Sequence, residues 1–349
     1  MSTTKWKCRL IARTVGSISI ALAITLLLTE LFLRIFIILP SATVSDPKLG
    51  WRYAPNATIL HSEEGYARNR LNSLGHNDKE NPNPEATRRI VAIGDSYTAA
   101  LHVSQEDNFT SVVELTSPCA DVLNAGRAGT TVVHYPVVIS RLVESYPFDE
   151  IVVIVSSGDL AEINSTNFEI KRASELGEIQ EIMLKDRQMS QMRQVFDPIF
   201  SRSSLATFLK NRIKQLILAS STKIERSGQT TSQKYDDQEI AEIFQFALTE
   251  INAMAPTSVL YIPNLQYMSH GQSRETSGSR RTWSLIKSVA EEIDLPFVRV
   301  DGLADVYRLG GNPPNGFANK DISSGHLNQL GHAITAKSIV ELLNLSCAK

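Results

Sequence analysis

The chain has 349 residues, of which 42% are hydrophobic and 21% charged, and its net charge at pH 7 is −2. This composition suffices for one large or two ordinary globular domains. The nearly balanced charge, without basic runs mixed with aromatic residues, argues against nucleic acid as a partner. The three cysteines include no Cys-x-x-Cys pair, and no metal-binding or nucleotide-binding motif is present, so the sequence predicts no metal site and no cofactor.

An apolar run near the amino end predicts a transmembrane helix within residues 14–39, so that residues 1–40 comprise a cytoplasmic amino end and a signal-anchor helix. Residues 14–29 carry no charge, the apolar character continues to Leu39, and Pro40 ends it. A helix over 15–39 would span about 37 Å, enough to cross a bilayer with tilt. Basic residues precede the run, so we expect a cytoplasmic amino end and an exported, periplasmic or extracellular, domain. A cleaved signal peptide is the alternative, although its apolar core would be overlong and no Ala-x-Ala site follows.

Residues 41–88 are a polar lead-in of turns and short extended pieces that ends in a proline-containing linker. From residue 89 to 349, apolar strand candidates alternate with amphipathic helix candidates. The strands are expected at 90–93, 121–123, 151–155, 258–262 and 297–300, and the helices near 106–116, 133–144, 238–253, 281–293 and 330–345. This alternation predicts a doubly wound α/β fold around a five-stranded parallel sheet.

The alternation is interrupted between about residues 165 and 236. The segment is polar with helical stretches, and residues 204–220 place apolar side chains on one side of a helix. We interpret it as a helical insertion, or cap, over the edge of the sheet. The amphipathic helix is expected to pack on its own domain rather than on a membrane surface.

Three of the predicted strands end in loops of small and polar residues. These loops are Gly94-Asp95-Ser96, Asn124-Ala125-Gly126 and Ser156-Ser157-Gly158-Asp159. The carboxyl ends of parallel strands meet at one edge of a sheet, where ligands bind. Ser96 can act there as a nucleophile if a base reaches it; otherwise Gly-Asp-Ser is a turn that caps a helix.

The sequence Gly325-His326-Leu327-Asn328, with Gly331-His332 after it, stands before the last helix. Together with the three loops, in this order, it resembles the SGNH (GDSL-type) hydrolase family over about residues 88–345, and in particular the family's membrane-anchored members. The resemblance implies a flavodoxin-like three-layer sandwich. It also implies hydrolysis or transfer of ester-linked acyl groups, often acetyl groups, on a carbohydrate or lipid.

The resemblance also implies roles for single residues. Ser96 would be the nucleophile and His326 its base, because a hydroxyl needs a neighbouring imidazole to lose its proton. The backbone N–H groups of Ser96 and Gly126 would hold the oxyanion.

The chain departs from the family pattern in two places. The third loop usually carries an Asn that donates to the oxyanion; here Gly158 takes its place, or one residue is missing, and losing such a donor can cost about 10²–10³ in rate. An Asp usually precedes the histidine by two or three residues, whereas here Asp321 is the nearest acid. His326 is then oriented by Asp321, by a backbone carbonyl, or by nothing.

Other residues of these motifs are secondary candidates. Asp95 and Asp159 lie in the loops, where Asp159 would brace them, and His332 has a structural or capping role. Cys119 and Cys347 are either buried thiols or one disulfide, since both are expected at the end of the sheet opposite the loops.

Two functions stay open on the sequence alone. One is a membrane-anchored, exported serine esterase or O-acyltransferase with an acylated carbohydrate or lipid as substrate. The other is an SGNH-fold binding or scaffold protein of the cell envelope that has lost efficient chemistry. The intact serine and histidine motifs favour the first, and the two departures favour the second.

Overall fold

The computed structural model describes residues 3–37, 42–173, 177–185, 203–209, 212–213, 234–268 and 270–347. The chain forms two compact units. One consists of Met1–Thr43 with Gln188–Thr230, and the other of Val44–Arg187 with Thr231–Lys349.

The first unit contains the long amino-terminal helix α1 (Thr3–Phe32), which continues as a π-helical turn over Leu33–Ile37. Its segment Arg13–Ile35 is long and apolar enough to cross a membrane, a criterion that a signal sequence also meets. The expected end of the span at residue 39 lies outside the described residues. Arg34 Nε donates to Glu30 Oε1 at 2.7 Å, so the two charges inside the apolar segment offset each other.

The second unit is built on a five-stranded sheet with the order β13-β10-β7-β5-β6. All four pairings are parallel. The strands are β5 (Arg88–Ile93), β6 (Ala120–Asn124), β7 (Glu150–Ser156), β10 (Thr257–Ile262) and β13 (Phe297–Arg299). Each one overlaps a predicted strand, so the predicted parallel sheet is confirmed.

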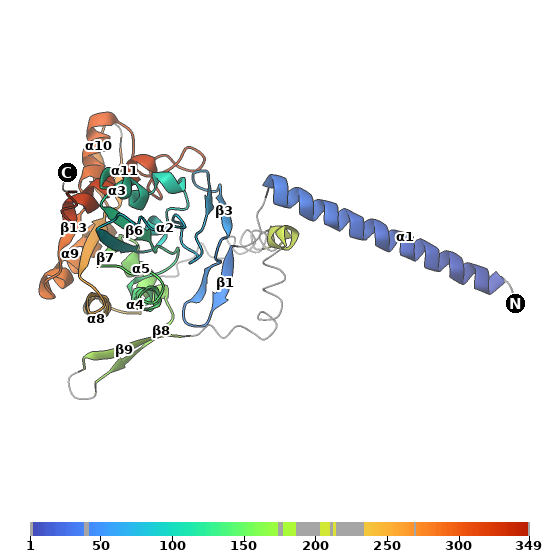
Figure 1. Ribbon diagram of the computed structural model, residues 1–349, viewed down its shortest axis with the longest axis horizontal. Coiled ribbons are helices and arrows are strands. Elements are labelled where there is room, and N and C mark those ends of the chain that lie inside the picture. Colours follow the sequence, from blue (N-terminus) through green and yellow to red (C-terminus); the bar gives the residue numbers. More distant parts are fainter. Residues whose placement is uncertain are drawn as a thin grey trace. The chain divides into compact units, whose positions relative to one another are not determined.

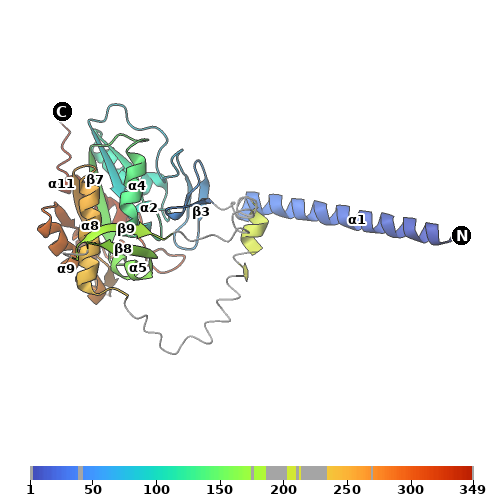
Figure 2. The same cartoon turned by 90° about the horizontal axis from the view of Figure 1, so that it is seen from below.

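Helices cover both faces of this sheet, which gives the predicted three layers. Figure 1 shows α3 (Phe109–Thr116) and α11 (Gln329–Leu342) on the upper side and α4 (Tyr135–Leu142) and α8 (Asp237–Asn252) on the lower side. Seen from below, α4, α8 and α9 (Ser277–Glu292) lie in front of the sheet (Figure 2).

Successive residues of a strand point to opposite faces of the sheet and pack into two separate hydrophobic cores. Ile90 and Ala92 of β5 pack with α3 and α11, whereas Val91 and Ile93 pack with α4, α8 and α9. Because both faces are covered, the strands have continuous apolar runs rather than an apolar–polar alternation. Two further helices, α5 (Asp159–Ser165) and α10 (Gly302–Gly310), belong to the same unit, together with the small hairpin of β11 (Leu265–Tyr267) and β12 (Ser273–Glu275).

The polar lead-in forms two hairpins and belongs to the same unit as the sheet from Val44 onward. The hairpins pair β1 (Thr43–Asp46) with β2 (Gly50–Tyr53) and β3 (Thr58–His61) with β4 (Ala67–Arg70). Leu71 is buried against Ala99 and Leu101, which follow the Ser96 loop. The lead-in therefore packs against the strand-end loops.

The insertion was expected to be helical, but it begins with two strands. Its first described part is an antiparallel hairpin of β8 (Phe168–Arg172) and β9 (Ile179–Leu184). Ile170 alternates with the charged Glu169 and Lys171, a two-residue period typical of a half-buried strand. Residues 204–209 and 212–213 are helical, while the rest of the predicted helix 204–220 lies outside the described residues.

Cys119 and Cys347 form a disulfide. It joins the segment before β6 to the segment after α11, at the end of the sheet opposite the strand-end loops. Of the two alternatives that the sequence left open, the structure has the disulfide.

Candidate active site

Ser96 stands at the first position of α2 (Ser96–Ala99), directly after β5. Asp95 caps this short helix by accepting a hydrogen bond from Tyr97 N at 2.8 Å. The turn thus holds Ser96 at the carboxyl end of a central strand, as predicted. Its Oγ lies 2.8 Å from Nε2 of His326, which comes from the loop before α11. The two predicted catalytic residues, 230 positions apart, therefore meet.

The other ring nitrogen of His326 contacts Glu64, a residue of the lead-in. The distance from Nδ1 to Glu64 Oε2 is 3.1 Å, and the backbone N–H of His326 donates to Oε1 at 2.6 Å. Burial alone would raise the pKa of Glu64, but the hydrogen bonds from His326 and Lys320 lower it to about 2. An ionised carboxylate only accepts hydrogen bonds, so Nδ1 carries the proton and Nε2 can accept one from Ser96.

Glu64 is held in place by its surroundings. The residue is 4% exposed, and Lys320 Nζ lies 3.1 Å from Oε2. Gly325 has a φ of +102°, and a Cβ on this residue would lie 2.1 Å from Glu64 Oε1. The glycine before His326 therefore makes room for the carboxylate that orients it.

Asp321 does not support His326, which corrects the sequence-based expectation. Its carboxylate is exposed and accepts hydrogen bonds from Ser323 N, Ser323 Oγ and Ser324 Oγ at 2.8–2.9 Å. These hydrogen bonds stabilise the loop that contains Asp321 and do not reach His326. Glu64, rather than Asp321, contacts Nδ1 of His326.

The predicted oxyanion hole is only partly present. Gly126 N donates to Asn124 Oδ1 at 3.0 Å, so the structure does not leave this amide free. A Cβ on Gly126 would lie 2.2 Å from Ala99 N. The absence of a side chain on this glycine therefore allows α2 to pack closely against the loop after β6. Gly158 N donates to Ser156 Oγ at 3.3 Å. Of the three predicted donors, only Ser96 N has no intramolecular acceptor among the described residues.

Asp95 and Asp159 both accept hydrogen bonds from Ser156, one from its side chain and the other from its backbone amide. Asp95 Oδ2 accepts from Ser156 Oγ at 2.9 Å, and Asp159 Oδ2 accepts from Ser156 N at 2.6 Å. Burial raises the pKa of both carboxyls. These contacts tie the loop after β7 to the Ser96 turn, which agrees with the bracing role predicted for Asp159.

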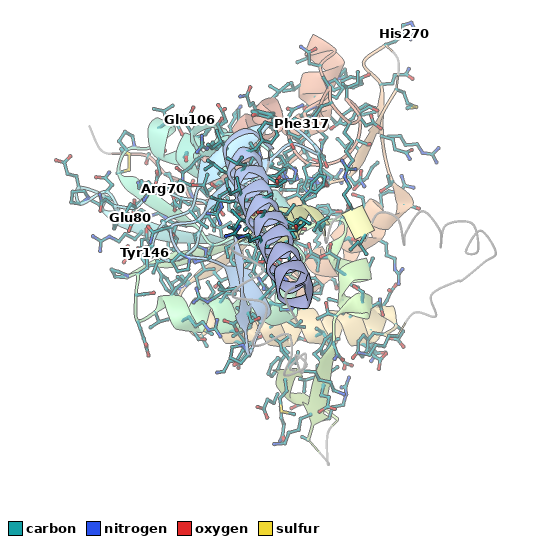
Figure 3. The ribbon with its side chains drawn as sticks, turned by 90° about the vertical axis from the view of Figure 1, so that its right-hand side faces the viewer. Arg70, Glu80, Glu106, Tyr146, His270 and Phe317 are labelled. Carbon is teal, nitrogen blue, oxygen red and sulfur yellow. A yellow bond between two sulfur atoms is a disulfide. The ribbon has the colours of Figure 1, made fainter. Side chains whose placement is uncertain are left out.

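A stack of rings covers His326. The His102 ring lies 3.7 Å from the His326 ring at an interplanar angle of 18°, and Phe317, labelled in Figure 3, lies 6.3 Å from His102 on a nearly parallel plane. Burial lowers the pKa of His102 to about 2, so its ring is neutral at ordinary pH. The stack limits rotation of His326 without adding a charge.

Glu64, His102 and His326 also have residue types that bind metals, with one ligand atom each within 4.8 Å of the others. An ion bound by an imidazole nitrogen lies in the plane of that ring. The centroids of the His102 and His326 rings lie 3.7 Å apart at an interplanar angle of 18°, so the in-plane lone pairs of the two rings do not converge on one point. An ion on His326 would also take either the nitrogen that contacts Ser96 or the one that contacts Glu64.

His332 is not part of this group of contacts. It is 1% exposed at the start of α11, and its ring stacks on Phe109 with centroids 5.7 Å apart. Burial lowers its pKa to about 3. The structural role predicted for His332 fits this environment.

Comparison with solved structures finds similar folds at low identity. They include an alpha/beta hydrolase enzyme from the metagenome of Lake Arreo (15% identity over 75% of this chain and 98% of that one, TM-score 0.42). A lipolytic protein of the G-D-S-L family from Veillonella parvula has 12% identity over 73% of this chain and 98% of that one, with a TM-score of 0.41. A catalytic mutant of an acetylxylan esterase from Geobacillus stearothermophilus has 13% identity over 76% of this chain and 100% of that one, with a TM-score of 0.42. No family model and no curated protein matches the chain.

Proposed function

We propose that this protein is a serine ester hydrolase with Ser96 as nucleophile, His326 as general base and Glu64 as the residue that orients the base. The observation that carries the proposal is the continuous path of hydrogen bonds from Ser96 Oγ through the His326 ring to Glu64. A nucleophile in contact with a base, itself oriented by a third group, is the arrangement that activates a serine.

In this mechanism Ser96 Oγ attacks the ester carbonyl while its proton passes to His326 Nε2. Glu64 stabilises the resulting imidazolium, and the N–H of Ser96 donates to the oxyanion. The tetrahedral intermediate collapses when His326 returns the proton to the leaving alcohol, which leaves an acyl group on Ser96. Water, or the hydroxyl of an acceptor, then attacks the acyl-enzyme with His326 again as base.

We further propose that the substrate is an acylated, in particular acetylated, carbohydrate or lipid outside the cytoplasm. The helix Arg13–Ile35 would anchor the enzyme, with its basic flank in the cytoplasm. The disulfide supports an oxidising compartment for the second unit. If a sugar hydroxyl replaces water in deacylation, the same residues perform acyl transfer.

Turnover of acetyl esters tests this proposal. The protein should release acetate from p-nitrophenyl acetate and from acetylated xylan, and Ser96→Ala should abolish both activities while it leaves the melting temperature unchanged. Activity in the Ser96→Ala variant equal to that of the parent would refute the proposal.

A binding or scaffold role is the second candidate, favoured by one observation. The amides of Gly126 and Gly158 already have intramolecular acceptors, so two of the three predicted oxyanion donors are engaged. A stable protein that binds acetylated glycans without releasing acetate would support this second role.

A further inference from the structure

A cavity of about 420 Å³ lies between the lead-in, the loop after β6 and helix α4. Neither Ser96 nor His326 lines it. Three arginines from these three elements do: Arg52 from β2, Arg127 from the loop and Arg141 from α4. We call it the arginine cavity.

Arg127 is the most deeply buried of the three arginines. It is 6% exposed, and its Nη1 donates to the backbone carbonyls of Leu49 and Trp51. The guanidinium also lies 4.8 Å over the Trp51 ring. In the described part of the chain it has no carboxylate within 4.0 Å, and its buried Nε has no hydrogen-bond partner. Burial lowers the pKa of Arg127 only to about 10, so the group stays charged at neutral pH.

The charges that line the arginine cavity do not balance. Asp46 is its one acidic lining residue; it accepts two hydrogen bonds from Arg141, at 2.7 and 3.0 Å, and Arg52 Nε lies 3.7 Å away. Arg52 and Arg141 are also partly exposed to solvent, with 43% and 39% of their side chains accessible, so Arg127 is the one guanidinium of the three that is both buried and without a carboxylate among the described residues. Charges removed from water are normally paired, because an unpaired one is costly to bury.

The rest of the lining gives the size and the character of a ligand. Leu49, Leu74, Val138 and Leu142 supply the apolar part of the lining, here called the apolar wall. The volume falls within the range of small-molecule sites. A ligand of the size of one hexose, with a charged group at one end, fits both the volume and the lining.

We propose that the arginine cavity binds a hexose-sized organic oxyanion, whose carboxylate or phosphate pairs with Arg127 and whose body contacts the apolar wall. A planar guanidinium with free N–H groups matches both oxyanions. The backbone N–H of Arg127 donates to Gly94 O at 3.0 Å, two residues before Ser96. A ligand held by Arg127 would therefore contact the loop after β6, and this loop is hydrogen-bonded to the turn that carries Ser96.

Isothermal titration calorimetry on the full chain in detergent tests the proposal. The Ser96→Ala variant is used, so that binding is measured without turnover and independently of the proposed esterase function. D-glucuronate and D-glucose 1-phosphate are the probes, D-glucose is the neutral control, and ionic strength is held constant with chloride. Saturable binding of either anion, with none of glucose, is expected; the anion that binds identifies carboxylate or phosphate as the preferred group.

Variants locate the binding. Arg127→Gln should weaken it at least tenfold, and Val138→Trp, which fills the cavity and keeps Arg127, should abolish it. Val137→Trp, the neighbouring substitution on α4 outside the lining, should bind as the parent does. Failure of both anions to bind to folded protein, or undiminished binding by a folded Val138→Trp variant, would overturn the proposal and leave Arg127 as a structural link to the lead-in.

Discussion

At the residue scale, the hydrogen bonds of His326 decide whether Ser96 is reactive. The Glu64 carboxylate fixes the proton on Nδ1 and thereby leaves the lone pair of Nε2 facing Ser96. This partner could not be predicted from the sequence, because it stands 262 residues before the histidine in a segment that reads as a polar linker. The serine and histidine were predictable because each stands in a short motif at the end of a periodic element.

Replacing Glu64 should therefore cost more activity than replacing Asp321. We expect Glu64→Gln to lower kcat about 10²–10⁴-fold, because an amide can stabilise the wrong tautomer of His326 and cannot stabilise the imidazolium. Asp321→Asn should change kcat less than about threefold, since that carboxylate contacts only its own loop. Steady-state kinetics on a soluble acetyl ester measures both, and the reverse order of effects would restore Asp321 as the orienting acid.

The His102 ring acts on His326 through packing. His102→Ala should lower kcat on the order of tenfold with little change in KM, because the freed imidazole spends less time aligned with Ser96. His102→Phe keeps an aromatic face and should recover most of the loss. A phenylalanine variant as impaired as the alanine variant would mean that the stack does not position His326.

At the element scale, apolar periodicity was sufficient for the five strands and most of the helices. It failed for the hairpin β8–β9, where only a few residues alternate within a polar segment, and for the lead-in, whose short strands gain stability from packing rather than from propensity. The engagement of Gly126 N by Asn124 depends on the conformation of a single loop, which no sequence period encodes.

Helix α1 makes a prediction about topology. If Arg13–Ile35 spans the membrane with its basic flank inside, protease added to spheroplasts should digest the second unit and leave a short amino-terminal fragment. Complete protection would contradict the proposed orientation. A soluble product that begins near residue 42 would instead support cleavage as a signal peptide.

At the scale of the whole molecule, buried neutral histidines make stability depend on pH. His332 has a folded pKa of about 3, below the unfolded value of about 6.5. Between these values the unfolded chain binds more protons, so this contribution to stability is present above pH 6.5 and is lost as the pH falls toward 3.

His332→Phe should remove that dependence while keeping the ring against Phe109. Its Nδ1 has no hydrogen-bond partner in the described structure, so the substitution removes no hydrogen bond at that atom. We expect the loss of unfolding free energy between pH 7 and 5 to be smaller by about 2 kcal/mol in the variant. Denaturant unfolding at the two pH values measures it, and equal losses in both proteins would show that His332 does not titrate on unfolding.

Covalent labelling tests most directly whether Ser96 is a nucleophile activated by His326 and Glu64. The full chain is treated with a fluorophosphonate, and the modified residue is located by peptide mass spectrometry. We expect one adduct on Ser96, labelling at least a hundredfold slower in Glu64→Gln, and an unchanged rate in Asp321→Asn. A folded protein that is not labelled at Ser96, or that is labelled equally fast without Glu64, would contradict it.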